Sequence, residues 1–175
     1  IYTFLGNIYL NKKKDVHSAR ACMESILELA KKTSFEEELM GGIDILTFSI
    51  RLAHYEGKME ERDCLIRQFA DRAVFSAIRS NMIEDVCDLA DFYMEIGKIE
   101  VCRKVLRLLE EMLQEINLLE IRKRFLESQI RFYSVTEDEE NRNAAAYRFY
   151  ELLKEQEREK ISAVLFALAI RKDLE

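Results

Sequence analysis

The sequence predicts an all-α protein, and three observations carry that prediction. The 175 residues contain no proline and only five glycines, so few residues can break a helix. Apolar residues recur at helical spacing nearly everywhere, and no long segment alternates with a period of two. Two stretches forty residues apart are almost the same, because Gly57-Lys58-Met59-Glu60 is echoed by Gly97-Lys98-Ile99-Glu100. Such an echo predicts a series of helical hairpins.

The composition fits one domain, residues 1–175, made of long amphipathic helices. Apolar residues make up 49% of the chain and charged residues 34%, which argues against disorder. The formal net charge is −6, so the chain lacks the basic excess that general nucleic-acid binding requires. No apolar run approaches the roughly 18 residues of a membrane span, and no signal peptide is visible. We therefore expect neither nucleic acid nor membrane as a partner.

The cysteines predict a reducing compartment. None stands in a C-x-x-C pair, and no histidine lies at zinc-ligand spacing from them. All four fall within predicted helices among apolar neighbours, where a thiol behaves as a small apolar side chain. We expect them to be buried and reduced, which is typical of a cytoplasmic protein. They are Cys22, Cys64, Cys87 and Cys102.

The first predicted hairpin covers residues 1–33. A helix over 2–11 leads into a turn of three lysines, and a second helix runs over 15–32. Asp15 can cap that second helix, because its short carboxylate accepts hydrogen bonds from the unpaired amides of a first turn.

The second predicted hairpin covers residues 34–80. A capping box opens at Ser34, followed by a helix over 35–56 and a partner helix over 59–80. Gly57 ends the first of these, since a residue without Cβ adopts the left-handed conformation that closes a helix.

One local rule is broken inside this hairpin. Gly41 and Gly42 lie within the predicted helix, where each costs about 1 kcal/mol relative to alanine. We favour a break that leaves a short helix over 35–40 and starts a new one at Ile43. The alternative is a close approach of two helices, or a hinge.

The third and fourth predicted hairpins cover residues 81–117 and 118–158. Gly97 ends the first helix of the third hairpin, and Thr136 with Glu139 forms a capping box in the fourth. A last helix over 160–175 has no partner, and because both ends of the chain fall inside helices we expect a fragment of a longer protein. The helices predicted in the two hairpins cover about 82–96, 99–116, 118–134 and 137–157.

Aligning the hairpins on their turns reveals a family resemblance. In the first hairpin, Leu5-Gly6 and Tyr9 are followed after the turn by a small residue, Ala19, and by large apolar residues. This pattern resembles the tetratricopeptide repeat, although the period here is nearer 40 than 34 residues and no proline closes a unit. Matching positions in the later hairpins are Ala53, Gly57, Met59, Ile66, Phe69, Ala90, Tyr93, Gly97, Ile99, Cys102, Leu106, Ile130, Tyr133, Ala145 and Phe149.

The resemblance implies a right-handed α–α superhelix of about four hairpins plus a C-terminal helix. In that family the first helix of each unit lines a concave groove that binds peptides or proteins. Arg51 and Arg131 on either side of Asp91 would suit a peptide of mixed charge, whereas the alternative is a set of ordinary solvated helix faces. The implied groove residues are Asn7, Asn11, Thr47, Arg51, His54, Asp88, Asp91, Arg124, Arg131 and Ser134.

Catalytic and cofactor signatures are missing from the sequence. It contains no H-E-x-x-H, no G-x-S-x-G and no phosphate-binding glycine loop. The acidic run over 137–140 lacks the mid-loop glycine of an EF-hand, so we interpret it as a charged turn and expect no metal and no cofactor. His17 is expected at the exposed start of a helix and His54 as a helix-dipole or surface residue near a helix end, with the aromatic residues mostly in the core. The aromatics concerned are Tyr2, Phe4, Phe48, Phe92, Phe132, Tyr147 and Phe149.

Three functional hypotheses fit these features. The leading hypothesis is a non-catalytic module that binds a protein or peptide. The alternative is a regulatory sensor, because the last helix resembles the connecting helix between a helical-repeat sensor and an output domain, as in diguanylate cyclases of the GGDEF type. That helix also offers a route to a homodimer. A third and weaker hypothesis is a peptide-sensing transcription regulator. The apolar side of the last helix is formed by Ile161, Val164, Leu165 and Leu168, with Lys172 next in the series.

Overall fold

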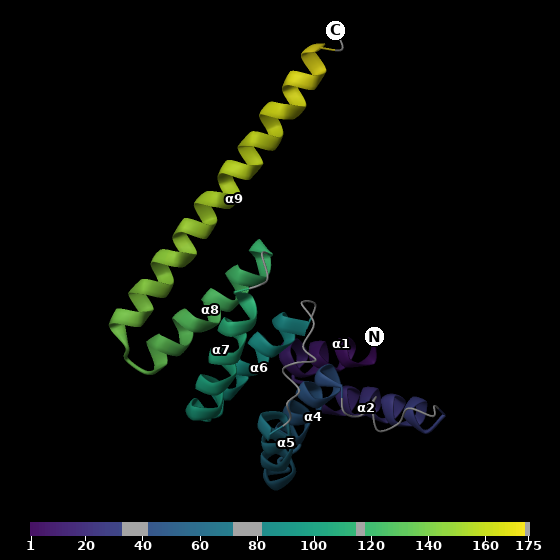
Figure 1. Ribbon diagram of the computed structural model, residues 1–175. Helices are drawn as coiled ribbons and strands as arrows, with labels where there is room; N and C mark the ends of the chain where they lie inside the picture. The colour runs from purple at the N-terminus through teal and green to yellow at the C-terminus, as the bar shows by residue number, and fades with distance from the viewer. Residues whose placement is uncertain (33–41, 72–81, 115–117, 174–175) are drawn as a thin grey trace. The chain divides into compact units, whose positions relative to one another are not determined.

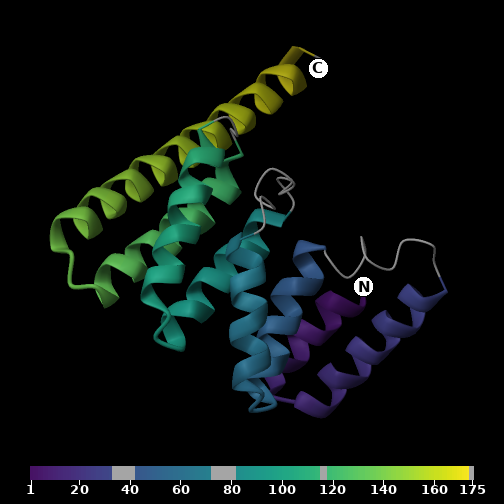
Figure 2. The same ribbon diagram turned by 60° about the horizontal axis from the view of Figure 1, so that its bottom comes forward.

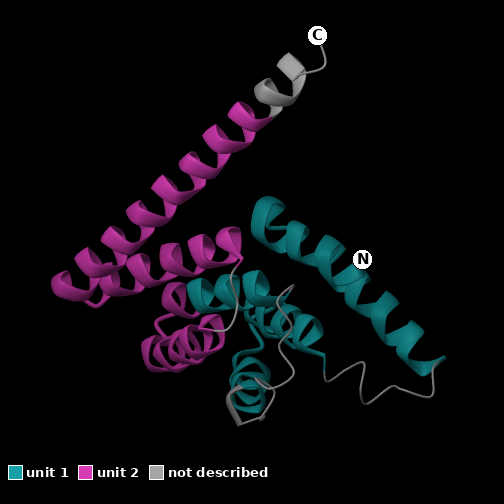
Figure 3. Cartoon of the chain, turned by 45° about the horizontal axis from the view of Figure 1, so that its top comes forward, with its two compact units in different colours: residues 1–92 teal, residues 93–175 magenta. Residues whose placement is uncertain are grey.

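The structure, a computed structural model, describes residues 1–32, 42–71, 82–114 and 118–173. This part of the chain consists of helices and their connections and contains no strand (Figure 1), so the predicted all-α class is confirmed. Contacts divide the chain into two compact units, residues 1–92 and 93–175 (Figure 3). The helices are α1 (Tyr2–Ile8), the π-helix η1 (Tyr9–Lys13), α2 (Val16–Lys31), α4 (Ile43–Tyr55), α5 (Met59–Asp71), α6 (Ile83–Glu95), α7 (Ile99–Leu113), α8 (Leu119–Val135) and α9 (Glu139–Asp173).

One turn recurs four times within the described residues. Its central residue has a positive φ, and this residue is Lys14, Gly57, Gly97 or Glu137. After Gly57 the amide of Lys58 donates to the carbonyl of Ala53 at 2.9 Å, and the same bond joins the equivalent residues in the next two turns. The last three central residues are spaced by forty, so the echo in the sequence corresponds to a repeated helix end.

The π-helix η1 is a one-residue insertion in the first copy of this turn. The amide of Asp15 donates to the carbonyl of Tyr9, six residues back, where the later turns span five. A wider helical loop accommodates the extra residue. Asn7 therefore occupies the position in α1 that Arg51 occupies in α4.

Two of the predicted helix starts are confirmed and one is wrong. Asp15 caps α2, accepting from the amide of Ser18 at 3.0 Å, and α4 begins at Ile43 after Gly42, as the glycine break predicts. Thr136, however, does not cap α9, because its hydroxyl donates to the carbonyl of Phe132 at the end of α8. Asp138 is the cap instead, accepting from the amide of Asn141 at 3.1 Å.

The predicted separation of the last helix is also wrong, because α9 runs unbroken through 35 residues. The residues between 157 and 160 are Glu, Arg, Glu and Lys, which are good helix formers, so nothing interrupts the helix there. At about 1.5 Å per residue, α9 is roughly twice as long as the 17-residue α8. Its distal half therefore extends beyond α8 (Figures 1 and 2). The other predicted boundaries over 33–41, 72–81 and 115–117 lie outside the described residues.

The core of the first unit lies among α1, α2 and α4. Leu10, Met23 and Ile26 from the first hairpin pack with Phe48 and Leu52 of α4. Helix α1 approaches α4 closely at Gly6, where a Cβ would overlap the buried ring of Phe48. The first predicted hairpin thus needs this glycine for packing.

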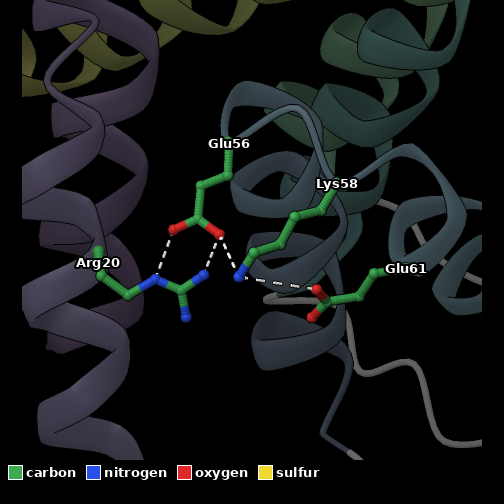
Figure 4. A network of polar contacts seen from close by, with 4 residues as sticks. All are labelled: Arg20, Glu56, Lys58 and Glu61. Carbon is green, nitrogen blue, oxygen red and sulfur yellow. Dashed lines mark hydrogen bonds and ion pairs between the residues drawn. The ribbon is translucent and has the colours of Figure 1, made fainter.

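An ion network joins α2 to the end of α4 (Figure 4). Arg20 donates two hydrogen bonds to Glu56, and Lys58 lies 3.0 Å from the same carboxylate. Burial alone would raise the pKa of Glu56, but the hydrogen bonds and charges of Arg20 and Lys58 outweigh it and hold that pKa below its usual value. Glu61 lies 3.9 Å from Lys58 and completes the network.

Several predicted core residues are exposed. Cys22, Cys87 and Cys102 are buried as predicted, whereas Cys64 is exposed because it lies on the polar side of α5. Among the aromatics, Phe48, Phe92 and Phe132 are buried and Phe149 is half-buried. Tyr2, Phe4 and Tyr147 are instead 40%, 68% and 65% exposed. Helical spacing identifies a face, but it does not show which faces are covered.

Candidate binding surface

Seven of the ten predicted groove residues belong to the unit of residues 1–92, and the other three to the second unit. In the first unit, α1 and η1 carry Asn7 and Asn11, α4 carries Thr47, Arg51 and His54, and α6 carries Asp88 and Asp91. In the second unit, α8 carries Arg124, Arg131 and Ser134.

Arg51 is the centre of the first set. Its side chain is only 4% exposed, which is rare for a charged residue. The Nη1 atom lies 3.5 Å from Oδ1 of Asn7, and the guanidinium carbon lies 5.9 Å from the ring centre of Phe92. The structure therefore brings Asn7 and Arg51 together across two helices, at equivalent positions of successive hairpins.

Three of the predicted groove residues are covered rather than open. Thr47 and Asp91 are 2% and 8% exposed, and Arg51 is equally inaccessible. The hydroxyl of Thr47 donates to the carbonyl of Asp44 at 3.0 Å, so it serves its own helix. These residues support the surface from beneath, and they cannot form its outer lining.

The outer lining contains carboxylates that the sequence reading missed. Asp44 on α4 and Asp85 on α6 are half-buried, as is the predicted Asp88. Burial raises the pKa of Asp85, the charge of Asp88 raises it further, Arg51 opposes the rise, and Asp44 and Glu84 add to it. Thr3 donates to Asp44 at 3.4 Å. The surface, which we name the acidic surface, consists of Thr3, Asn7, Asp44, Asp85 and Asp88 over buried Arg51.

A sequence signal for the two missed carboxylates does exist. Asp44 lies seven residues before Arg51, and Asp85 lies three residues before Asp88, so each pair shares a helix face. The signal is easily missed because Asp44 and Asp85 both lie in the first turn of a helix, where acidic residues are ordinarily explained by the helix dipole.

His54 and Asn11 lie apart from the acidic surface. His54 is half-buried, with Nδ1 3.1 Å from Nη1 of Arg62 and its ring edge-on to Phe92 at 5.2 Å. It lies in the last turn of α4, which agrees with the helix-dipole position predicted for it, and it is packed against α5 and α6 rather than open at the surface. Asn11 is exposed on η1, and His17 is exposed as predicted.

The three predicted residues of the second unit lie on α8 and differ in their surroundings. Arg124 is half-buried and donates to the hydroxyl of Ser128 at 2.9 Å within its own helix. Ser134 is exposed, and its hydroxyl donates to the carbonyl of Ile130 at 2.8 Å. Arg131 is also exposed.

A hollow in the second unit lies on the other side of α8. It measures about 690 Å³ and is bounded by α7, α8 and α9. Leu113, Phe125 and Leu126 form an apolar base, and Arg148 crosses its edge to reach Glu110 at 3.2 Å and Gln129 at 3.0 Å. None of the predicted groove residues lines it.

The described residues offer no metal centre, since no three His, Cys, Asp or Glu side chains converge among them. In the acidic run, Asp138 is engaged with Asn141, whose side-chain and backbone hydrogen bonds hold the pKa of Asp138 below its usual value. No helix within the described ranges has the length and apolarity to cross a bilayer. No family model, curated protein or solved structure matches the chain.

Proposed function

We propose that this chain is a non-catalytic binding module that holds a peptide or protein segment on the acidic surface of residues 1–92. One observation carries the proposal: α1, α4 and α6 each place polar side chains around the buried guanidinium of Arg51. Burying a charged group costs free energy. We infer that Arg51 lies beneath this half-exposed surface because it contributes to binding. The recurring turn supports tetratricopeptide-like hairpins forming a right-handed superhelix.

The charge of the surface points to a basic partner rather than one of mixed charge. Asp44, Asp85 and Asp88 outnumber the single buried arginine, and the raised pKa of Asp85 reflects burial together with their repulsion. A lysine or arginine side chain from a partner would relieve this repulsion. Such a contact is a charge-assisted hydrogen bond, stronger than a neutral one.

A direct test is the binding of labelled peptides followed by fluorescence anisotropy. Three nonapeptide sets that differ only in charge, basic, neutral and acidic, are titrated with the whole chain. We expect the basic set to bind most tightly and its affinity to fall as salt rises. Asp85→Asn with Asp88→Asn should weaken the basic set about tenfold.

The matched control removes the same two charges elsewhere. Glu24 and Glu28 are both exposed on α2, so Glu24→Gln with Glu28→Gln changes the net charge equally without touching the acidic surface. If the two double variants weaken binding equally, the effect comes from the net charge of the chain and not from the acidic surface, and the proposed site is rejected. Binding that is indifferent to peptide charge would reject the partner class.

A second function is favoured by α9. We propose that this helix makes the chain a regulatory module. In this proposal α9 pairs two copies and couples partner binding to the activity of an attached output domain. The supporting observation is that all side chains over 157–166 are exposed, including apolar ones.

Coupling between the two sites tests this second function. If peptide binding and pairing through α9 are linked, the peptide must change the dimerisation constant by the same factor as dimerisation changes peptide affinity. Analytical ultracentrifugation with and without saturating basic peptide measures that factor. An unchanged dimerisation constant would reject the regulatory coupling while leaving peptide binding intact.

A further inference from the structure

Helix α9 is covered by α8 on one side and carries an apolar stripe on the far side. The covered side includes buried Ala145 and half-buried Phe149. Gln156 reaches Glu120 at the start of α8, so this packing ends near the middle of α9. Beyond it, the side chains of residues 157–166 are all exposed.

The apolar stripe lies roughly 130° around the helix axis from the covered side, at about 100° per residue. It consists of six side chains that are 36–65% exposed, and we name it the outer stripe. Because it faces away from α8, a second helix can lie along it without displacing α8. The outer stripe is formed by Tyr147, Tyr150, Leu153, Ile161, Val164 and Leu165.

The positions along the outer stripe form a symmetric series. Six of them alternate in spacing between three and four residues, which is the seam of a two-stranded coiled coil. The centre of the series lies between residues 155 and 156, which is also the middle of α9, since this helix runs from residue 139 to residue 173. Two ions of opposite charge stand next to the centre, and apolar residues stand at equal distances beyond them. In chain order the series is Tyr147, Tyr150, Lys154, Glu157, Ile161 and Val164.

We propose that the outer stripe is the docking surface for a second copy of this chain, in an antiparallel pair of α9 helices. The inference rests on the second proposed function and specifies its surface, its partner, its orientation and its register. The two-fold axis of the pair passes through the centre of the series. The half of each α9 that extends beyond α8 (Figure 1) then lies against the α8-bearing half of the other copy.

Charge complementarity identifies a second copy as the occupant. In an interface with two-fold symmetry, a residue that contacts a second residue is matched by the reverse contact. Residues at equal distances from the centre therefore face each other, so Lys154 of each copy faces Glu157 of the other. Both contacts are charge-assisted hydrogen bonds, which are stronger than neutral ones. The apolar pairs that face each other are Tyr150 with Ile161 and Tyr147 with Val164.

The same two ions exclude the neighbouring arrangements. In a parallel two-fold pair, Lys154 would face Lys154 and Glu157 would face Glu157, so both contacts would be repulsive. Sliding the antiparallel pair by one heptad would place both ions opposite apolar residues, and a buried ion without a partner costs free energy. Only the antiparallel register centred between residues 155 and 156 pairs both charges.

A second charge pair flanks the seam. With Lys154 and Ile161 at a positions of the heptad, Glu151 and Arg158 both take e positions, where ion pairs between helices set partner choice and orientation. The two-fold axis of an antiparallel pair keeps the e positions of both helices on one side, so Glu151 lies beside Arg158 of the other copy. In the single chain Glu151 lies 3.1 Å from Lys154, so in the pair each of these ions has a partner in the other copy.

The available area is sufficient for a weak, specific dimer. Aromatic side chains bury about 150–250 Å² each when fully covered, so the half-exposed outer stripe with the stems of Lys154 and Glu157 offers roughly 500–600 Å² per copy. Two copies then bury about 1,000–1,200 Å², which is the lower end of specific interfaces. We therefore expect a dissociation constant in the micromolar range.

The first part of the test is sedimentation of the whole chain from about 10 to 500 μM. We expect a monomer–dimer equilibrium that Ile161→Glu weakens at least tenfold. Phe166→Glu is the matched control, because Phe166 is 68% exposed on the same stretch of helix. It lies five residues after Ile161, which is about 140° around the helix axis. Circular dichroism verifies that both variants keep their helix content.

The second part tests orientation by disulfide crosslinking. Tyr150→Cys and Ile161→Cys are made separately in a Cys64→Ser background, which removes the exposed native thiol. An oxidised mixture of the two proteins should give a crosslinked dimer with one copy of each. Neither protein alone should crosslink, because identical positions are then about 16 Å apart along the axis and a disulfide needs Cα atoms within about 7 Å.

The third part tests the register by charge reversal. Lys154→Glu places two carboxylates opposite each other at both contacts, so it should weaken the dimer about tenfold. Adding Glu157→Lys restores opposite charges and should bring the affinity back within threefold of the original.

The outcomes separate the claims. A monomer at 500 μM would overturn both this inference and the dimerising function. A dimer that Phe166→Glu weakens as much as Ile161→Glu does would overturn the outer stripe alone. Crosslinking of either cysteine variant by itself would overturn the antiparallel arrangement, and a double charge reversal that does not restore affinity would overturn the register. Peptide binding by residues 1–92 would stand in every case.

Discussion

Helices α4 and α9 break the ordinary rule of burial in opposite directions. Nine of the 13 residues of α4 are buried, and one of them is the charged Arg51. Over residues 139–166 of α9, where the structure describes the side chains, Ala145 alone is buried while tyrosine, leucine and isoleucine side chains are exposed. Charge inside and apolar surface outside are both unfavourable for an isolated chain. This difference is the basis of the proposals that α4 contributes to a surface for a charged partner and that α9 offers an apolar one.

The largest expected effect on stability comes from removing the buried charge of α4. Arg51→Ala should lower the free energy of unfolding by about 3–5 kcal/mol, because it leaves the surrounding carboxylates without their buried cation. Ile161→Ala, on the exposed side of α9, should change it by less than about 0.5 kcal/mol. Urea denaturation at a concentration that keeps the chain monomeric measures both. A loss below about 1 kcal/mol for Arg51→Ala would show that the charge of Arg51 does not stabilise the surrounding carboxylates.

A smaller effect tests the packing that positions α4 beside α1. Gly6→Ala should destabilise the fold by about 1–3 kcal/mol, because the new Cβ overlaps the fully buried Phe48 ring and forces it or its surroundings to shift. Phe48→Leu removes the overlapping ring atoms, so the double variant should lose less than the two single losses added together. Thermal unfolding of the four proteins checks this, and strict additivity would contradict the close approach.

The repeated turn predicts that substitutions at two equivalent positions change the stability of the fold in opposite directions. Glu137 has φ of 57°, a conformation that costs a residue with a Cβ about 1 kcal/mol, so Glu137→Gly should stabilise the fold by up to that amount. Gly57→Ala should destabilise it by a similar amount, because Gly57 has φ of 76°. Chemical denaturation measures both, and two changes of the same sign would contradict equivalent turns.

The smallest effects concern pH, and their signs differ between two carboxylates. The folded pKa of Asp85 is raised, so its contribution to stability is present at low pH and is lost as the pH rises through that pKa. Asp85→Asn should therefore stabilise the chain at pH 7, and the gain should vanish below about pH 4. A stability profile from pH 3 to 8 measures it, and a loss at pH 7 would contradict repulsion on the acidic surface.

Glu56 provides the opposite profile. Its folded pKa is lowered, so its stabilisation is present at neutral pH and is lost as the pH falls through that pKa. Glu56→Gln should destabilise the chain at pH 7 and become neutral in acid. Parallel profiles for the two variants would show that the surroundings of these carboxylates do not differ as described.

The sequence predicted the helices well because their ends have local causes. Gly57, Gly97 and the Asp15 cap each act within a few residues, so the local sequence is enough to predict these helix ends. No such local cause is present between residues 157 and 160. The break predicted there is absent, because the residues favour a continuous helix.

The candidate site was only partly predictable, because burial depends on neighbours that lie far apart in sequence. Alignment of the hairpins identified Asn7, Arg51 and Asp88, and the structure brings the first two together. It could not show that Arg51 lies beneath the surface, since that depends on α1 and α6 covering α4. Asp44 and Asp85 were missed because a first-turn carboxylate has an ordinary explanation.

The most direct test of the central claim is amide chemical-shift mapping of the chain with the tightest-binding basic peptide. We expect the largest changes at the amides around Asn7, Asp44, Asp85 and Asp88, and we expect Asp85→Asn with Asp88→Asn to reduce them in proportion to its weaker binding at a peptide concentration near the dissociation constant. Changes confined to residues 93–175, or no changes at peptide concentrations that saturate the anisotropy signal, would contradict it.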